Sequence, residues 1–197
     1  MVMIDISSYS IFEKNKSTLK ETSKDDADKR NIKYMTHSEF EVIDFDGVKN
    51  DYIKGLKLGD TPKSNDALCI RNNELYFIEF KNGNMKKEIH NVKRKIFDSI
   101  LIFIDIINKG ISHTRKDLNY ILVYNKDYRP NPTKKLDKDE VQESKELDKF
   151  ISLINKHGRL EPDPFELSKQ FKNLYFKKVY TYTAEEFEEK FVIEIEK

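Results

Sequence analysis

Three charged side chains, Asp66, Glu79 and Lys81, have the types and the spacing for metal-dependent chemistry on a phosphodiester. The pair Asn72-Asn73 lies between two apolar runs, and asparagine tolerates the positive φ that a two-residue type I′ hairpin turn requires. Such a hairpin sets Asp66 directly opposite Glu79, and Lys81 follows on the same face because strand side chains alternate. Two opposed carboxylates destabilise a sheet unless a cation or a proton lies between them. Mg²⁺ often takes one or two carboxylates together with water and phosphate oxygens, so these residues form a minimal hydrolytic set.

The tripeptide Asp/Glu-x-Lys is uninformative by itself, because it occurs three times, starting at Glu79, Glu143 and Glu188. The second and third copies lie in charged, helix-like patterns that a solvated surface explains. Only Glu79 and Lys81 interrupt an apolar strand, where a carboxylate is costly to bury unless it is paired or bound to metal. Two explanations stay open, namely a structural ion pair between Lys81 and Glu79, or a cation shared by Asp66 and Glu79.

The elements around this hairpin follow from hydrophobic periodicity and turn residues. Near alternation of apolar and acidic residues predicts a strand over 39–48 that ends at Gly47, and Gly and Pro residues make the segment up to the hairpin mainly irregular. Asn84 is the expected N-cap of a long helix that ends near Gly110, and a buried strand is expected over 119–125. Further on we expect a loop over 126–139, a surface helix over 139–157, a strand within 174–182 and a short acidic helix capped by Thr183 and Glu186.

The long helix carries basic residues at an end where positive charge is unfavourable. Its apolar stripe comprises Ile89, Val92, Ile96, Ile100, Phe103 and Ile107. A helix N-terminus already has a partial positive charge, so lysines in the first turn suggest that an anion such as phosphate is bound there. The candidate substrate-binding residues are Lys86, Lys87, His90, Lys93 and Arg94, several of which share a face with Phe97. A lysine-rich solvated face is an equally good explanation.

The sequence resembles the PD-(D/E)XK nuclease superfamily, which has the restriction-endonuclease-like fold. The resemblance rests on Asp66, on Glu79-Phe80-Lys81 at the end of the next strand, and on the basic helix and strand that follow, roughly residues 64–125. It implies an α/β core with a mixed sheet, in which a hairpin meander is followed by a long helix and a parallel strand, with helices on both faces. It further implies that Asp66 and Glu79 are ligands of Mg²⁺ or Mn²⁺, and that Lys81 positions water or stabilises the transition state.

Two features depart from the family pattern. Asn65 stands where the family name expects proline, next to the carboxylate that matters more. Many members add an acidic residue from the first helix, and the nearest candidates here are Glu39 and Glu41, although their surroundings have the pattern of a strand.

Length predicts one domain over 1–197. The family resemblance and the expected elements imply a core at about 39–125, with helix-strand-helix additions at 139–197. The 36 basic and 35 acidic residues give a net charge of +1, which argues against a uniformly basic nucleic-acid coat. Cys69, the one cysteine, lies in an apolar run and is expected to be buried in a reducing compartment. No apolar stretch is long enough to span a membrane, and the N-terminus lacks a secretory pattern, so we expect a cytoplasmic location.

These observations predict a Mg²⁺-dependent endonuclease with nucleic acid as its partner, and the choice of DNA rests on the family resemblance alone. The alternative is a binding module of the same fold with weak or absent catalysis, acting as an interaction, inhibitor or immunity-type protein. Its support is the near-zero net charge and an acidic C-terminal segment, which could dock a protein partner. The acidic residues of this C-terminal segment are Glu185, Glu186, Glu188, Glu189, Glu194 and Glu196. A homodimer is a further option.

Overall fold

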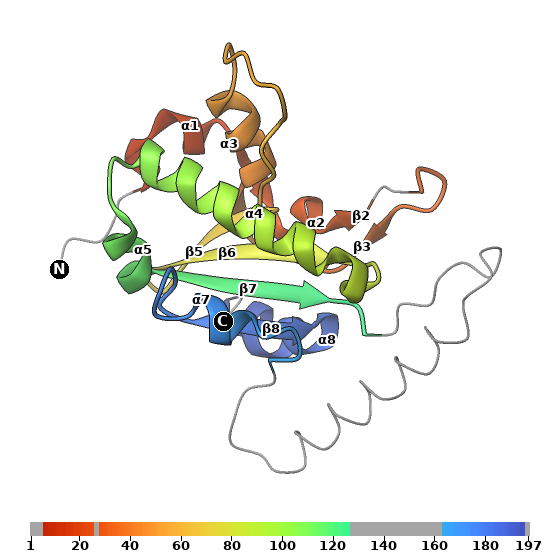
Figure 1. Ribbon diagram of the computed structural model, residues 1–197. Helices are drawn as coiled ribbons and strands as arrows, with labels where there is room; N and C mark the ends of the chain where they lie inside the picture. The colour runs from red at the N-terminus through yellow and green to blue at the C-terminus, as the bar shows by residue number, and fades with distance from the viewer. Residues whose placement is uncertain (1–5, 26–27, 127–162, 196–197) are drawn as a thin grey trace.

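A six-stranded mixed sheet forms the centre of the computed structural model, which describes residues 6–25, 28–126 and 163–195 (Figure 1). The strand order is β1-β4-β5-β6-β7-β8, and a separate two-stranded sheet joins β2 to β3. The meander β4-β5-β6 is antiparallel, whereas β6, β7 and β8 run parallel to one another. The strands are β1 (Lys16–Thr18), β2 (Lys24–Asp25), β3 (Lys33–Tyr34), β4 (Glu41–Asp44), β5 (Ala67–Arg71), β6 (Glu74–Lys81), β7 (Leu118–Tyr124) and β8 (Val179–Thr183).

The predicted hairpin forms with the predicted register. Asn72 and Asn73 both take positive φ, 47° and 62°, as a type I′ turn requires. Arg71 pairs with Glu74, and the ladder continues without a bulge to Ala67, which pairs with Ile78. The two asparagines therefore determine which residues of β5 and β6 face one another.

The long helix α4 (Met85–Ile106) connects β6 to the parallel strand β7, as the sequence predicts. It begins directly after Asn84, and its apolar stripe lies against the sheet, with Val92 and Ile96 fully buried. It ends four residues before Gly110, because Asn108 takes the left-handed conformation with φ 51° and the Lys109 N–H bonds back to the Ile104 carbonyl. A short helix, α5 (Ile111–Asp117), completes the crossover.

The strand predicted over 39–48 is too long, because the chain becomes helical after Asp44. The Asp44 carboxylate accepts hydrogen bonds from the N–H groups of Asp46 and Gly47, and so caps helix α3 (Phe45–Tyr52). Gly47 consequently lies inside this helix, at a position where a Cβ atom would collide with the side chain of Asn15.

Helices cover both faces of the sheet, and each face has its own hydrophobic core. On one face α4 packs with α1 (Ser10–Glu13), α3 and α7 (Leu167–Phe171), while on the other α8 (Ala184–Phe187) and the π-helical turn η2 (Glu188–Val192) pack against alternate residues of the same strands. Figure 1 shows α4 and α8 on opposite sides of the sheet. The other helices in the described part of the chain are η1 (Ile6–Ser8), α2 (Leu19–Thr22) and α9 (Ile193–Ile195).

The C-terminal expectations are met in part. The capping box of Thr183 and Glu186 is present at the start of α8. The strand predicted within 174–182 begins only at Val179, because the preceding residues turn, with the Tyr175 N–H bonded to the Phe171 carbonyl. The predicted loop at 126–139 (beyond Lys126) and the predicted helix at 139–157 lie outside the described residues. Among the described helices, none combines the length and the apolar character that crossing a membrane requires.

Candidate active site

The β5–β6 hairpin brings Asp66 and Glu79 side by side, on the face of the sheet that α4 covers. Asp66 directly precedes β5, and its N–H donates to the Ile78 carbonyl at 3.1 Å, which extends the hairpin register by one residue. Its carboxylate accepts a 2.6 Å hydrogen bond from the Phe80 N–H. Glu79 is fully buried, whereas 15% of the Asp66 side chain is exposed. The pair therefore has one closed end and one end open to solvent.

Two ammonium groups neutralise this pair of carboxylates. Lys95, from the middle of α4, lies between them, with its Nζ 2.7 Å from Glu79 Oε1 and 2.9 Å from Asp66 Oδ1. Lys81 Nζ lies 3.1 Å from the same Glu79 oxygen and 3.9 Å from a carboxylate oxygen of Glu88. Among the described residues neither Glu79 oxygen accepts a hydrogen bond of good geometry, so its contacts with the lysines are ion pairs. The ion pair between Lys81 and Glu79 is thus present, and the ammonium of Lys95, which the sequence did not suggest, bridges the two carboxylates.

Helix α4 also holds the segment that delivers Asp66 to the site. The Lys63 N–H donates to the Asp98 carboxylate at 2.8 Å, and the Asn65 N–H donates to the Ser99 hydroxyl at 2.8 Å. Proline at position 65 has no N–H and could not make the second bond. With asparagine instead of proline at this position, the residue before Asp66 gains a hydrogen bond to the helix.

Burial and mutual repulsion alter the acidity of the site. Burial, reinforced by the charge of Asp66, raises the pKa of Glu79 to about 7, although Lys95 and Lys81 oppose the shift. Burial by itself would lower the pKa of Lys95, but the charges of Glu79 and Asp66 outweigh it and raise that pKa. The pKa of the buried Tyr120 hydroxyl is raised well above its usual value, first by burial and then by the same two carboxylates. Lys95 therefore stays protonated and positively charged, whereas the buried Glu79 carboxylate takes up a proton more readily than an exposed glutamate does.

The raised pKa of Glu79 predicts a pH-dependent cost in stability for the metal-free protein. The folded protein retains the proton of Glu79 up to about pH 7, whereas the unfolded chain loses it near the usual value of 4.5. Because the folded state binds more protons in this window, its stability falls as the pH rises, by about 3 kcal/mol between the two values. The measurement is the difference in free energy of unfolding between the natural protein and Glu79→Gln, in the presence of a chelator. A difference that does not change with pH would show that the lysines offset burial completely.

The two acidic residues considered as additions from the first helix lie elsewhere. Glu39 pairs with Lys20 at 2.8 Å, and Glu41, which is part of β4, pairs with Lys16 at 3.3 Å. Both carboxylates are largely exposed. Among the described residues no group of three or more His, Cys, Asp or Glu side chains is arranged to hold a metal ion.

The candidate substrate-binding residues lie along α4, apart from the carboxylates. Lys87 and His90 are exposed, Lys93 is half-buried, and Arg94 is paired with Asp60 at 2.6 Å and with Asp98 at 3.5 Å. The side chain of Lys86 lies outside the described part of the structure. Phe97, expected on the face shared by His90 and Lys93, packs edge-on against Phe171 and Tyr175. Of the residues predicted for the site, the structure brings Asp66, Glu79 and Lys81 together.

Lys95 is the site residue that sequence reasoning missed. It lies three residues after Val92 and directly before Ile96, on the border of the apolar stripe and on the flank opposite His90. A lysine on such a border extends its ammonium away from apolar surroundings toward any nearby acid. Its place beside the stripe was the available signal, and the density of other lysines on the same helix obscured it.

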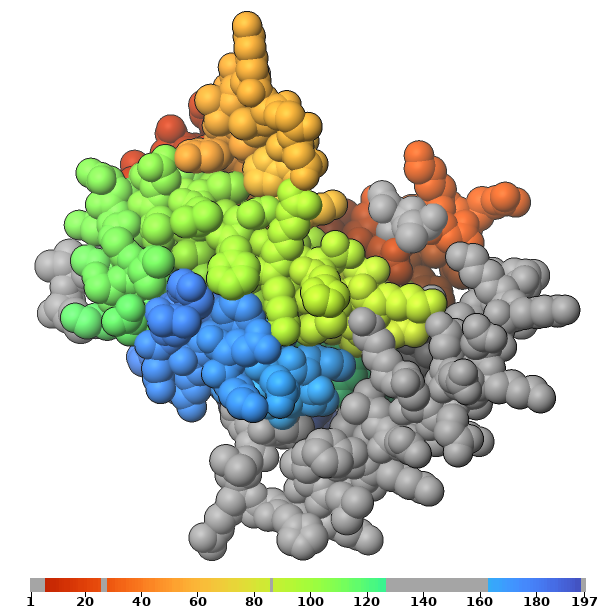
Figure 2. Space-filling model, in the orientation of Figure 1, coloured from red at the N-terminus to blue at the C-terminus, as the bar shows by residue number. Residues whose placement is uncertain are grey.

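A projecting loop leads into the site. Residues 53–63 follow α3 and form the orange projection at the top of Figure 2, which stands clear of the rest of the molecule. Leu56 and Leu58 are 56% and 49% exposed on it. The ion pair between Asp60 and Arg94 ties the base of the loop to α4. The loop over residues 53–63 is therefore attached to α4 through Asp60, while its tip projects from the rest of the molecule.

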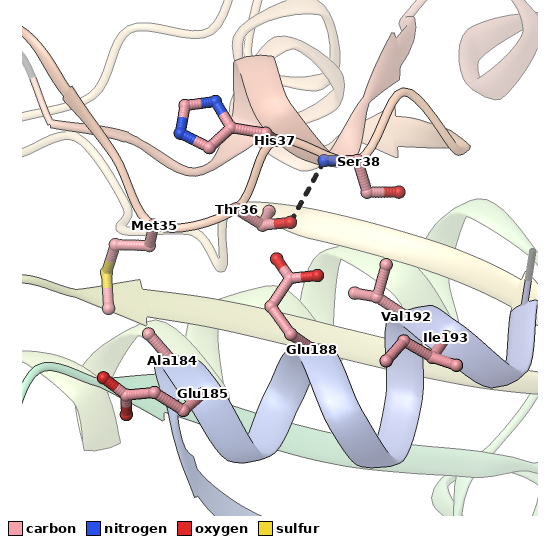
Figure 3. A pocket seen from close by; sticks show the side chains of 9 residues that line it. All are labelled: Met35, Thr36, His37, Ser38, Ala184, Glu185, Glu188, Val192 and Ile193. Carbon is pink, nitrogen blue, oxygen red and sulfur yellow. Dashed lines mark hydrogen bonds between the residues drawn. The ribbon is translucent and has the colours of Figure 1, made fainter.

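A separate cavity of about 530 Å³ lies on the other face of the sheet, between residues 35–38 and the helices α8 and η2. Figure 3 shows Glu188 directed toward Thr36 and Ser38, while His37 points away. None of the residues that surround Asp66 and Glu79 lines this cavity.

The carboxylate pair is chemically suited to a divalent ion, and the position of Lys95 shows that a cation fits between its members. Mg²⁺ in phosphate-handling sites often uses only one or two carboxylates and completes its shell with water and substrate oxygens.

Comparison of the chain with models of protein families, with curated proteins and with solved structures finds no match.

Proposed function

We propose that this chain is a metal-dependent endonuclease of the PD-(D/E)XK type that hydrolyses phosphodiester bonds in DNA. The observation that carries the proposal is the position of the Lys95 ammonium, which lies 2.7 and 2.9 Å from two opposed carboxylates. At this place the side chain of Asp66 is partly exposed to solvent. The antiparallel meander, the long helix α4 and the parallel strand β7 support it, because the family resemblance implies this order of elements.

Asp66 and Glu79 would hold Mg²⁺ or Mn²⁺, and each residue of the site has a separate task. The bound ion would lower the pKa of its water and stabilise charge on the phosphoryl oxygens. Asp66 is positioned by the Phe80 N–H, and Glu79 by the register of β6. Lys81, with 18% of its side chain exposed, can reach past Glu79 toward solvent and place its ammonium beside the developing charge.

The proposal predicts that metal binding and DNA cleavage both depend on the two carboxylates. We expect the natural protein to bind Mn²⁺ in calorimetry and to nick supercoiled plasmid, and we expect Asp66→Asn and Glu79→Gln to lose both properties. Either substitution removes one negative ligand and keeps the size of the side chain. A natural protein that binds neither Mn²⁺ nor Mg²⁺ would refute the proposal.

A matched control is available in the same chain. Glu188 begins the third Glu-x-Lys tripeptide, but it lies in η2 on the other face of the sheet. Glu188→Gln makes the same chemical change and should leave Mn²⁺ affinity and nicking at the level of the natural protein. Folding of each variant is checked by its thermal transition, since loss of structure in Asp66→Asn or Glu79→Gln would instead indicate a purely structural ion pair.

A second candidate is a binding module of the same fold without catalysis. The observation that favours it is that Lys95 and Lys81 already balance the charges of Asp66 and Glu79 without a metal ion. The acidic C-terminal helices would then provide the partner surface, although Glu186 pairs with Lys190 and Glu194 with Arg71. An intact fold with no metal affinity in the calorimetry above is the outcome that selects this candidate.

A further inference from the structure

The ammonium of Lys95 lies where a cation shared by Asp66 and Glu79 would have to bind. It contacts one oxygen of each carboxylate at 2.7 and 2.9 Å, and only 15% of the Lys95 side chain is exposed. A Mg²⁺ ion bound by the same oxygens needs ligand distances of about 2.1 Å. The ion and the ammonium therefore cannot share this space, because both require the same oxygens and repel each other.

The net charge of the site also indicates that the metal ion and both ammonium groups cannot be bound together. Lys95 and Lys81 together offset Asp66 and Glu79, so a divalent ion that entered with both lysines in place would leave the site with two surplus positive charges. Charges in a largely buried site are poorly screened by solvent. Release of one ammonium removes half of that surplus, and Lys95 is the one that contacts both carboxylates.

Lys95 can leave without disturbing the rest of the site. The contacts from Lys63 to Asp98 and from Asn65 to Ser99 hold the strand segment on α4 without it. The four-carbon stem of lysine is flexible, and Asp46, which pairs with Lys49 at 3.0 Å, is a further acid that the charge of Lys95 already affects. Burial would raise the pKa of Asp46, but Ser64, Lys49 and the charge of Lys95 together lower it, and half of the Asp46 side chain is exposed.

We propose that Lys95 is an internal competitor of the divalent ion: it neutralises Asp66 and Glu79 in the metal-free protein, and metal binding requires that its ammonium be expelled. This inference rests on the proposed function, because it concerns the same carboxylates. It makes Lys95 the residue that sets metal affinity, whereas Asp66 and Glu79 provide the ligands. The metal-free protein is thereby kept folded at the expense of a weaker metal site.

The test compares Mn²⁺ binding by the natural protein, Lys95→Met and the control Lys109→Met. Methionine keeps the unbranched side chain and removes the charge, and Lys109 is an exposed lysine three residues after the end of α4. We expect Lys95→Met to bind Mn²⁺ at least tenfold more tightly and to gain more in melting temperature from saturating Mn²⁺. Lys109→Met should match the natural protein in both measurements.

Without its internal cation Lys95→Met could unfold, so a second measurement uses the natural protein. In the ¹⁵N NMR spectrum, Mg²⁺ should shift or abolish the signal of the Lys95 ammonium, which is assigned by its loss in Lys95→Arg. Equal Mn²⁺ affinity of the natural protein and Lys95→Met, or an unperturbed signal at saturating Mg²⁺, would overturn the competition while the proposed function stands. Binding by Lys95→Met alone would support the competition and remove the proposed function. Absence of binding by either folded protein would overturn both.

Discussion

Replacement of Lys81 by Met is expected to lower the rate of DNA cleavage by about 10²–10³-fold, the loss typical when one electrostatic stabiliser of a transition state is removed. Its ammonium lies 3.1 Å from Glu79 Oε1 and is accessible from solvent, so it can approach a bound phosphodiester. The ammonium neither binds the metal nor lies between the two carboxylates, so Mn²⁺ affinity should not fall when it is removed. The measurements are single-turnover nicking of plasmid at saturating Mn²⁺ and calorimetry of Mn²⁺ binding on the same preparation.

The control for this prediction is Lys87→Met, which removes an exposed lysine from the first turn of α4. It should weaken DNA binding at most, and the weakening should diminish as salt is raised, because exposed charges are screened. A Lys81→Met protein that cleaves at the natural rate would exclude the catalytic role of Lys81. The two site lysines are further distinguished by metal affinity, which Lys95→Met should raise much more than Lys81→Met, because only Lys95 lies between the two carboxylates.

The hairpin was predictable from local chemistry, because Asn72 and Asn73 determine the turn and the turn determines the register. The position of Asp66 against Glu79 follows from those two residues alone. The long helix was predictable for a similar reason, since its apolar stripe repeats over six positions that face the sheet. In both cases the information lies within one continuous segment of the chain.

Features that depend on tertiary contacts were not predictable in this way. The strand over 39–48 is cut short at Asp44 because that side chain caps a helix, and alternation of apolar and acidic residues does not reveal a cap. Strand β1 has only three residues and pairs with β4, although helix α2 and the strands β2 and β3 lie between them in the sequence. Lys95 could not be placed at the carboxylates without knowing how α4 is rotated on the sheet, since its contacts join residues 29 and 16 positions apart.

The packing beneath the site leads to the second large expected effect, the loss of stability in Phe77→Ala. Phe77 is fully buried on β6, two residues before Glu79 on the same face. Its ring packs edge-on against the rings of Phe45 and Phe103, with centroid distances of 4.7 and 5.6 Å. Truncation of a buried phenylalanine costs about 3–5 kcal/mol, because apolar contacts are lost and a cavity remains. A loss of this size is a large part of the total stability of a single domain, about 5–15 kcal/mol.

Urea unfolding of Phe77→Ala and of the control Ile70→Ala separates this packing from a general effect of shortening a side chain in the hairpin. Ile70 lies on the neighbouring strand β5 and is 43% exposed, so its truncation should cost only about 1 kcal/mol or less. Because Phe77 joins β6 to α3 and α4, its truncation should also loosen the contact between α4 and the two carboxylates. Metal affinity should therefore change in Phe77→Ala and not in Ile70→Ala, although neither residue touches the site. Equal costs for the two variants would mean that the core under α4 does not hold Glu79 in register with Lys95.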